Sequence, residues 1–186
     1  MSWQGSASPA ECLWLRTVAT GMRHAAETGF NEGCSAAAML SANPVIRVVS
    51  FELAEHYDLQ LARYRVDAAF PGRHTLIPGD SRETVPAWEW PLFDLFFVDG
   101  DHSYEGAMAD LRSALGVVRP GGLIVIDDLT PWKPWGAGPV MAWREFCATG
   151  AVVQVDLRRD GELIGEIPES GGPIDRVWAA GLVPVS

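Results

Sequence analysis

The sequence predicts an α/β protein built on a doubly wound, mostly parallel seven-stranded sheet with helices on both faces and an antiparallel last strand. Short apolar runs alternate with stretches of helical spacing from residue 22 onward, which is typical of parallel strands joined by helices. Leu123–Ile126 is an unbroken apolar run, as expected for a central strand that is buried on both faces. Glycine and acidic residues follow several of the runs, and ligands bind at the carboxyl ends of such strands.

The chain is expected to begin with a packing or lid helix over Pro9–Ala19, because Pro9 suits a first turn and Gly21 a stop. The strands that follow are expected at Met22–Thr28, Val45–Glu52, His74–Ile77, Phe93–Asp99, Leu123–Asp127 and Val152–Leu157. The helices between them are expected at Glu32–Ser41, His56–Phe70, Tyr104–Val118 and Val140–Thr149.

The end of the sheet is predicted from a turn motif. Arg158–Gly161 has the composition of a tight turn, after which Leu163–Ile167 is expected to return as the antiparallel last strand. Residues 168–186 are expected to form an irregular tail that wraps the edge of the sheet. Without internal repeats or a linker, residues 1–186 are predicted to form one domain, with an N-terminal helix in 1–21, a core in 22–168 and a tail in 169–186.

Composition and charge exclude several classes of protein. Apolar residues make up 48% and charged residues 20% of the 186 residues, as in soluble globular proteins. The net charge is -10 and no basic cluster interrupts it, which disfavours nucleic acid as a partner. No apolar run is long enough to span a membrane, and Met1–Gly5 lacks the features of a signal peptide. We therefore expect a cytoplasmic protein. Cys12, Cys34 and Cys147 have no metal-binding spacing and are interpreted as packing residues.

Three consecutive turns have the residues of a ligand site. The first strand is followed by residues 27–35, in which glycines would let the backbone approach a ligand, although they would equally suit a tight strand-to-helix turn. The second strand ends at Glu52, where a carboxylate can accept both hydroxyls of a ribose. The third ends in Gly79–Ser81. Because the dinucleotide pattern G-x-G-x-x-G is incomplete, a nucleoside without phosphates is favoured over a pyrophosphate.

Acidic residues also end the next two strands. Asp99 follows the fourth strand, and Asp127 and Asp128 follow the fifth. Neighbouring strands lie about 5 Å apart, so the three carboxylates would repel one another unless a cation separates them. Oxygen ligands alone suit Mg²⁺, or another divalent cation such as manganese or calcium, and not zinc.

Several residues near the strand ends have a structural interpretation as well as a functional one. Asp101 is better explained as the cap of the following helix, and Asp128 would also suit a loop cap. His102 fits either a hydrogen-bonded loop histidine or a general base that takes a proton from a hydroxyl polarised by the metal. Trp132 and Trp135 would form an aromatic wall for a ring-shaped acceptor or pack their loop. For Trp88 and Trp90, packing is favoured over flanking an adenine.

Four motifs, GFNEGCSA, GDS, FDLFFVDGDHSYEG and PGGLIVIDD, occur in this order between Met22 and Asp128. Together they resemble the class I S-adenosylmethionine-dependent methyltransferases, which have a Rossmann-like fold, and in particular the small group with a DGDHSYEG motif. That group is similar in layout to the cation-dependent catechol and caffeoyl-CoA O-methyltransferases. The resemblance implies an enzyme that transfers a methyl group by direct displacement to a hydroxyl of a small molecule, such as a phenol or a sugar.

The resemblance also implies roles for residues. Glu27, Gly29 and Ser35 would hold the methionine part of the cofactor, with Phe30 in the same loop; Glu52 would hold the ribose; and Asp80 with Ser81 the adenine. Asp99, which also borders the cofactor, would bind the metal together with Asp127 and Asp128. His102 stands where the catechol enzymes carry a lysine, so its assignment as the base follows histidine-using sugar O-methyltransferases. Asp128 replaces the asparagine that is common in the plant enzymes.

Three other functions remain open at this point. One is a metal-independent methyltransferase, and a second is a nonenzymatic module that binds the same cofactor. The third, a nucleotide-dependent oxidoreductase, is the least favoured because its glycine pattern is incomplete. The short segment before the first strand leaves little material for a lid, so a second subunit is expected to complete the acceptor site, as a homodimer would.

Overall fold

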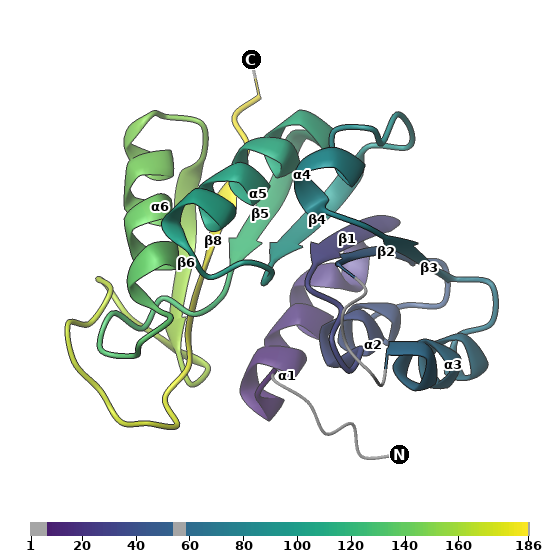
Figure 1. Ribbon diagram of the computed structural model, residues 1–186, viewed down its shortest axis with the longest axis horizontal. Helices are drawn as coiled ribbons and strands as arrows, with labels where there is room; N and C mark the ends of the chain where they lie inside the picture. The colour runs from purple at the N-terminus through teal and green to yellow at the C-terminus, as the bar shows by residue number, and fades with distance from the viewer. Residues whose placement is uncertain (1–6, 54–58, 186) are drawn as a thin grey trace.

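The computed structural model describes residues 7–53 and 59–185. Across these residues eight strands form one sheet in the order β3-β2-β1-β4-β5-β8-β6-β7 (Figure 1). The strands are β1 (His24–Thr28), β2 (Arg47–Glu52), β3 (His74–Pro78), β4 (Phe93–Val98), β5 (Val118–Ile126), β6 (Val153–Arg159), β7 (Glu162–Leu163) and β8 (Val177–Leu182). The helices are α1 (Pro9–Val18), the short 3-10 helix η1 (Ala19–Gly21), α2 (Cys34–Leu40), α3 (Leu59–Ala69), α4 (Ser81–Thr84), α5 (Tyr104–Val117) and α6 (Ala137–Ala148).

The predicted class and the order of its main elements are confirmed. Neighbours among β1 to β5 pair in parallel, whereas β8 pairs antiparallel with both β5 and β6. The start of the third predicted helix, from His56, lies outside the described residues. Most of the other boundaries agree within two residues. The starts of two elements differ by more: α6 begins three residues early because Pro139 is tolerated in a first turn, and β5 begins five residues early, before a register shift opposite β4.

The expectation of an irregular tail after residue 168 is wrong, and so is the count of seven strands. Val177–Leu182 forms β8, which lies between β5 and β6 inside the sheet. Its run V-W-A-A-G-L is apolar and its first five residues are buried, so burial on both faces stabilises it there. The predicted strand Leu163–Ile167 shrinks to β7, a two-residue edge strand after the turn at Asp160 and Gly161, both with positive φ.

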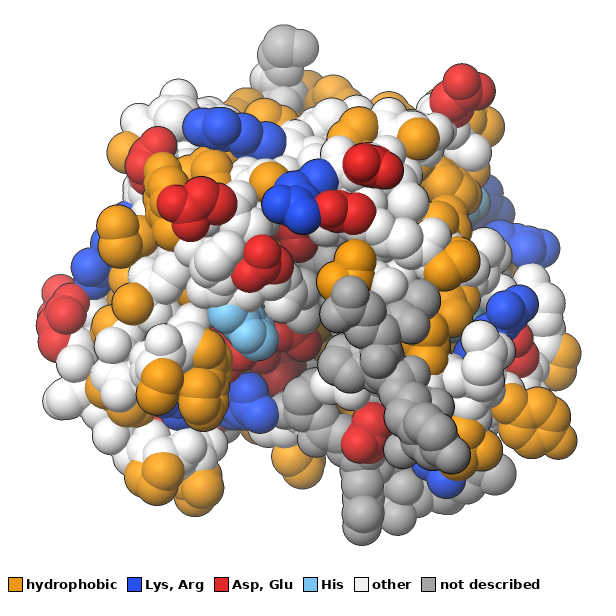
Figure 2. Space-filling view, in the orientation of Figure 1, with side chains coloured by type: hydrophobic (Ala, Val, Ile, Leu, Met, Phe, Trp, Pro, Cys, Tyr) orange, Lys and Arg blue, Asp and Glu red, His pale blue; other side chains and the backbone are white. Residues whose placement is uncertain are grey.

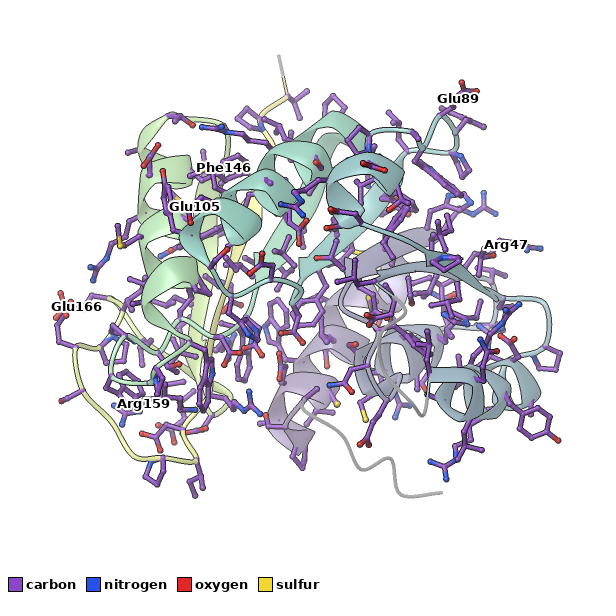
Figure 3. All side chains as sticks on the ribbon, viewed as in Figure 1. Arg47, Glu89, Glu105, Phe146, Arg159 and Glu166 are labelled. Atoms are coloured by element: carbon purple, nitrogen blue, oxygen red, sulfur yellow. The ribbon has the colours of Figure 1, made fainter. Side chains whose placement is uncertain are left out.

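The core has two parts, one on each face of the sheet. Helices α1, α2 and α3 cover one face of the sheet, and α5 and α6 cover the other. Alternate residues of a strand point to opposite faces, so one strand can contribute side chains to both parts of the core. In β5, Ile124 belongs to one cluster and Val125 to the other, which is the two-sided burial that its sequence predicts. Figure 3 shows Phe146 on α6, which packs beside α5. None of the helices within the described residues is long and apolar enough to cross a membrane.

Candidate active site

A cavity of about 510 Å³ opens at the carboxyl ends of the parallel strands. Figure 2 shows a histidine in a hollow with acidic side chains beneath it and a basic side chain beside it. The volume is in the range of small-molecule sites. The residues that line the cavity are Thr28, Gly29, Asn31, Phe51, Glu52, Leu53, Asp80, Ser81, Arg82, Asp99, Gly100, Asp101, His102, Gly106, Asp110, Asp128 and Arg176.

The loop tips gather because the hydrogen-bond ladder continues one residue beyond the strands. The amide of Gly29 donates to Phe51 O at 3.0 Å, and the amide of Asp99 donates to Thr28 O at 3.1 Å. Gly29 has a φ of +84°, and a Cβ there would overlap the carbonyl oxygen of Asp99. Glycine is therefore required at this turn, where the first strand meets the fourth.

At one end of the cavity the carboxylates are fixed by backbone amides. Glu52 is buried, and its Oε2 accepts a hydrogen bond from the amide of Asn31 at 2.9 Å. Asp80 caps α4 by accepting from the amide of Arg82. The Arg82 side chain also binds Asp80, with Nη2 2.6 Å from Oδ2. This hydrogen bond lowers the pKa of Asp80. The turns after β2 and β3 therefore each present a fixed carboxylate to the cavity.

Three residues that are predicted to bind the cofactor do not line the cavity: Glu27, Phe30 and Ser35. The Ser50 hydroxyl lies 2.6 Å from Oε1 of Glu27 and 3.0 Å from Nε2 of His74. Burial raises the pKa of Glu27 to about 8, although the Ser35 and Ser50 hydroxyls lower it. Ser35 is buried in the first turn of α2. Phe30 stacks on the His74 ring, with 5.0 Å between centroids, inside the core. Direct contact of these residues with a cofactor stays a prediction.

At the other end of the cavity, Asp99, His102 and Asp128 converge. Each has a possible ligand atom within 4.8 Å of the other two. His102 Nε2 lies 3.1 Å from Asp128 Oδ2 and 3.6 Å from Asp99 Oδ1, and these carboxylates raise the pKa of His102 to about 10. Burial raises the pKa of Asp99. Burial opposes ionisation of Asp128 too, but His102 and Arg176 together lower its pKa.

Asp127 lies one layer behind that cluster. It is 3% exposed and does not line the cavity. Burial raises its pKa well above the usual range, and so do the nearby charges of Glu11, Asp99 and Asp128. Its Oδ1 atom has no hydrogen-bond partner among the described residues, while Oδ2 lies 3.9 Å from Nη1 of Arg176. The convergent set is therefore Asp99, His102 and Asp128, rather than the three aspartates that strand spacing predicts.

The remaining predicted residues are Asp101, four tryptophans and three cysteines, and most of them have structural contacts. The side chain of Asp101 accepts from the amide of Ser103 at 2.8 Å, at the start of α5, and Asp101 also lines the cavity. Trp132 donates to Gly172 O at 3.0 Å and packs its loop, whereas Trp135 is 44% exposed. Trp88 donates to Pro91 O and stacks on Phe93, and Trp90 is exposed; neither lines the cavity. Burial raises the pKa of all three cysteine thiols to about 11, which suits packing residues.

The sequence interpretation missed several charged residues in or beside the site. Arg176 precedes β8 and lies 3.3 Å from Oδ1 of Asp128, in a segment expected to be irregular. Arg159, labelled in Figure 3, binds Asp175, which is the residue before Arg176, and so helps to fix that segment. Glu11 of α1 is fully buried near Asp127, and burial raises its pKa to about 8. Asp110 lies on α5 beside Leu111 and Ala114, and an acid on an apolar helix face was a signal that could have found it.

A family model described as a methyltransferase domain matches residues 26–129, which is more than half of the chain. The chain belongs to this methyltransferase domain family. The match contains β1 to β5 and the acids after them. No curated protein sequence matches the chain.

Solved methyltransferase structures have the same fold as this methyltransferase domain. The O-methyltransferase from Bacillus cereus, in complex with SAH, is 21% identical with a TM-score of 0.72, covering 95% of this chain and 82% of that one. TomG from Streptomyces achromogenes, an O-methyltransferase in complex with SAM, is 20% identical with a TM-score of 0.71, covering 97% and 82%. The cofactor-bound Rv0187 from MTB is 24% identical with a TM-score of 0.73, covering 96% and 81%. At these identities the likeness supports the fold.

Proposed function

We propose that this methyltransferase domain uses S-adenosylmethionine (SAM) to methylate a hydroxyl of a small molecule and that a divalent cation assists. One observation carries the proposal: Gly29, Glu52, Asp80 and Asp99, which come from four different strand ends, line a single cavity. The O-methyltransferases of the same fold were solved with SAM or its product S-adenosylhomocysteine (SAH).

The chain's own residues would do the following. Glu52, held by the Asn31 amide, would accept the ribose hydroxyls. The acidic lining of the cavity would favour the positive sulfonium group. His102 lines the cavity at the opposite end, between Asp99 and Asp128, and is the candidate base. It would take the proton of the acceptor hydroxyl at Nε2 in its neutral form, which these two carboxylates disfavour by raising its pKa to about 10. Catalysis would then depend mainly on aligning the acceptor oxygen with the methyl group.

The donor set fits a hard cation. Asp99 and Asp128 offer carboxylate oxygens within reach of one point, and burial with mutual repulsion raises the pKa of Asp99 and Asp127. Oxygen donors of this kind suit Mg²⁺. A bound cation would supply polarisation of the acceptor oxygen. The carboxylates that would hold it are also those that keep a proton on His102, so the base and the cation site depend on each other.

A second candidate function is methyl transfer without a metal. The observation that favours it is that His102 and Arg176 already place two cationic side chains against the acids. Titration calorimetry with SAH tests the shared part of both candidates, since a chain that does not bind SAH has neither function. A nonenzymatic binding module would bind SAH but turn over no acceptor.

Removal of metal separates the two candidates. We expect EDTA treatment followed by dialysis to abolish SAH production from a panel of phenol and sugar acceptors, and added Mg²⁺ to restore it. Calcium, which binds similar ligands with different geometry, serves as the control ion. Unchanged turnover after EDTA would contradict the cation and favour the metal-independent enzyme.

A further inference from the structure

Asp110 is a buried acid that the proposed chemistry does not use. It lies on α5, is 1% exposed and still borders the cavity. Burial raises its pKa, although Ser81 and Thr28 lower it. An acid in this position is costly unless it makes specific contacts.

The first contact is to the turn after β3. Ser81 Oγ donates to Oδ1 of Asp110 at 2.7 Å. Ser81 is the first residue of α4, a four-residue helix with no buried side chain, and α4 lies beside α5 (Figure 1). Val85 anchors the far end of this helix in the core. The link to Asp110 therefore holds the end that faces the cavity, where hydrophobic burial contributes nothing.

The second contact is to the ends of β1 and β4. A Cβ on Gly100 would lie 2.8 Å from Oδ2 of Asp110 and 3.3 Å from Oγ1 of Thr28. Both oxygens are buried, and the Thr28 hydroxyl lowers the pKa of Asp110 by hydrogen bonding to it. Asp110 therefore lies against three segments that line the cavity: Ser81 after β3, Thr28 at the end of β1 and Gly100 after β4.

We propose that Asp110 is a positioning residue that fixes the Asp80–Ser81 turn against the ends of β1 and β4 and so preforms the nucleoside end of the cofactor cavity. The proposal rests on the proposed function, because it assumes that this cavity binds SAM. It assigns Asp110 to cofactor affinity rather than to the reaction step, because His102 and Asp128 belong to the other end of the cavity.

The test compares two substitutions of one side chain by calorimetry with SAH. Asp110→Ala removes the acceptor for Ser81 and is expected to weaken SAH binding about tenfold or more, as for the loss of a buried hydrogen bond that organises a site. Asp110→Asn keeps an acceptor for Ser81 and offers an N–H group that the Thr28 hydroxyl oxygen can accept. We expect it to bind SAH within about twofold of the wild type.

Val117→Ala is the matched control, because Val117 is buried on the same helix and does not line the cavity. It should lower the melting temperature and leave SAH affinity unchanged. With any accepted substrate, Asp110→Ala should raise the KM for SAM and leave kcat within about twofold.

The possible failures can be told apart. If the wild type does not bind SAH, the proposed function is wrong. If the wild type binds SAH and Asp110→Ala binds it equally well, the positioning role is wrong while the proposed function stands. If Asp110→Asn weakens binding as much as Asp110→Ala, the hydrogen-bond geometry proposed for Asp110 is also wrong. Should Asp110→Ala fail to fold, Ser81→Ala removes the same hydrogen bond from its half-buried partner and is expected to weaken SAH binding in the same direction.

Discussion

Two groups of buried acids lie at neighbouring strands and are stabilised in different ways. The first contains Glu27, whose contacts run through Ser50 to His74 and from there to Asp67, with Nδ1 of His74 3.1 Å from the Asp67 carboxylate. Burial lowers the pKa of His74, so its ring is neutral and lies between the Asp67 carboxylate and the Ser50 hydroxyl. Ser50 donates to Oε1 of Glu27 at 2.6 Å, but burial outweighs this hydrogen bond and raises the pKa of Glu27 to about 8.

The second group contains Asp99, Asp127 and Asp128, which face cationic side chains instead. His102 and Arg176 lie within 3.3 Å of Asp128. Asp99 and Asp128 of this group line the cavity, whereas Glu27 is fully enclosed. The difference teaches how one sheet holds acids for two purposes. The enclosed acid Glu27 has a pKa raised by burial, whereas the pKa of Asp128, which borders the cavity, is lowered by cationic side chains that a ligand can replace.

The largest expected effect comes from removing a charge in the second group. Asp99→Asn should lower methyl transfer by about two to four orders of magnitude, because it removes a carboxylate to which the proposed function gives a role beside His102 and the cation. Its melting temperature should not fall, since burial already disfavours the charged form of Asp99. Acceptor assays and thermal unfolding measure the two quantities. Retained turnover would show that Asp99 only orders the loop.

The next effect concerns Glu27 and depends on pH. The unfolded chain loses this proton near pH 4.5, whereas the folded protein keeps it until about pH 8. Wild-type stability should therefore fall as the pH rises from about 4.5 to about 8, relative to Glu27→Gln, by a few kcal/mol in total. Urea unfolding of both proteins at several pH values checks this. The charges of Asp99 and Glu52 also raise the pKa of Glu27. Glu52→Gln is therefore the control that measures how much a neighbouring carboxylate contributes to the pH dependence of stability. Parallel curves for wild type and Glu27→Gln would mean that Glu27 is ionised in the fold.

The smallest effect should come from the bridging hydroxyl of the first group. Ser50→Ala leaves Glu27 and His74 without their shared partner and is expected to cost about 1–2 kcal/mol of stability. Because the site lies elsewhere, SAH affinity should stay the same. The measurement is urea unfolding beside calorimetry, with Ser41→Ala, an exposed serine of α2's C-terminal cap, as the control. A loss of SAH affinity larger than the loss of stability would connect the two groups.

Local pattern predicted most of this fold and part of the site. Glu52 and Asp99 stand at strand ends, where topology alone brings loop tips together, and the structure places both at the cavity. Spacing along the strands could not say which way a side chain points once the strand has ended. Asp128 has a positive φ of 57°, so it turns toward His102 while Asp127 turns inward, and the predicted trio of aspartates separates.

Contacts between distant segments could not be read from local pattern. Glu11 comes from the first helix and Arg176 from the segment before the last strand, yet both lie near Asp127. The strand Val177–Leu182 is short and contains alanine and glycine, which favour strands weakly. Only its position between two other strands, where every side chain but the last is buried, explains why it forms.

The placement of β8 between β5 and β6 sets an order for biosynthesis. A ribosome makes this strand after both of its neighbours, so an emerging chain passes through a stage in which β5 has an open edge and the hairpin of β6 and β7 has nothing to join. Folding to completion, and with it the arrival of Arg176 beside Asp127 and Asp128, must wait for that late segment to leave the exit tunnel.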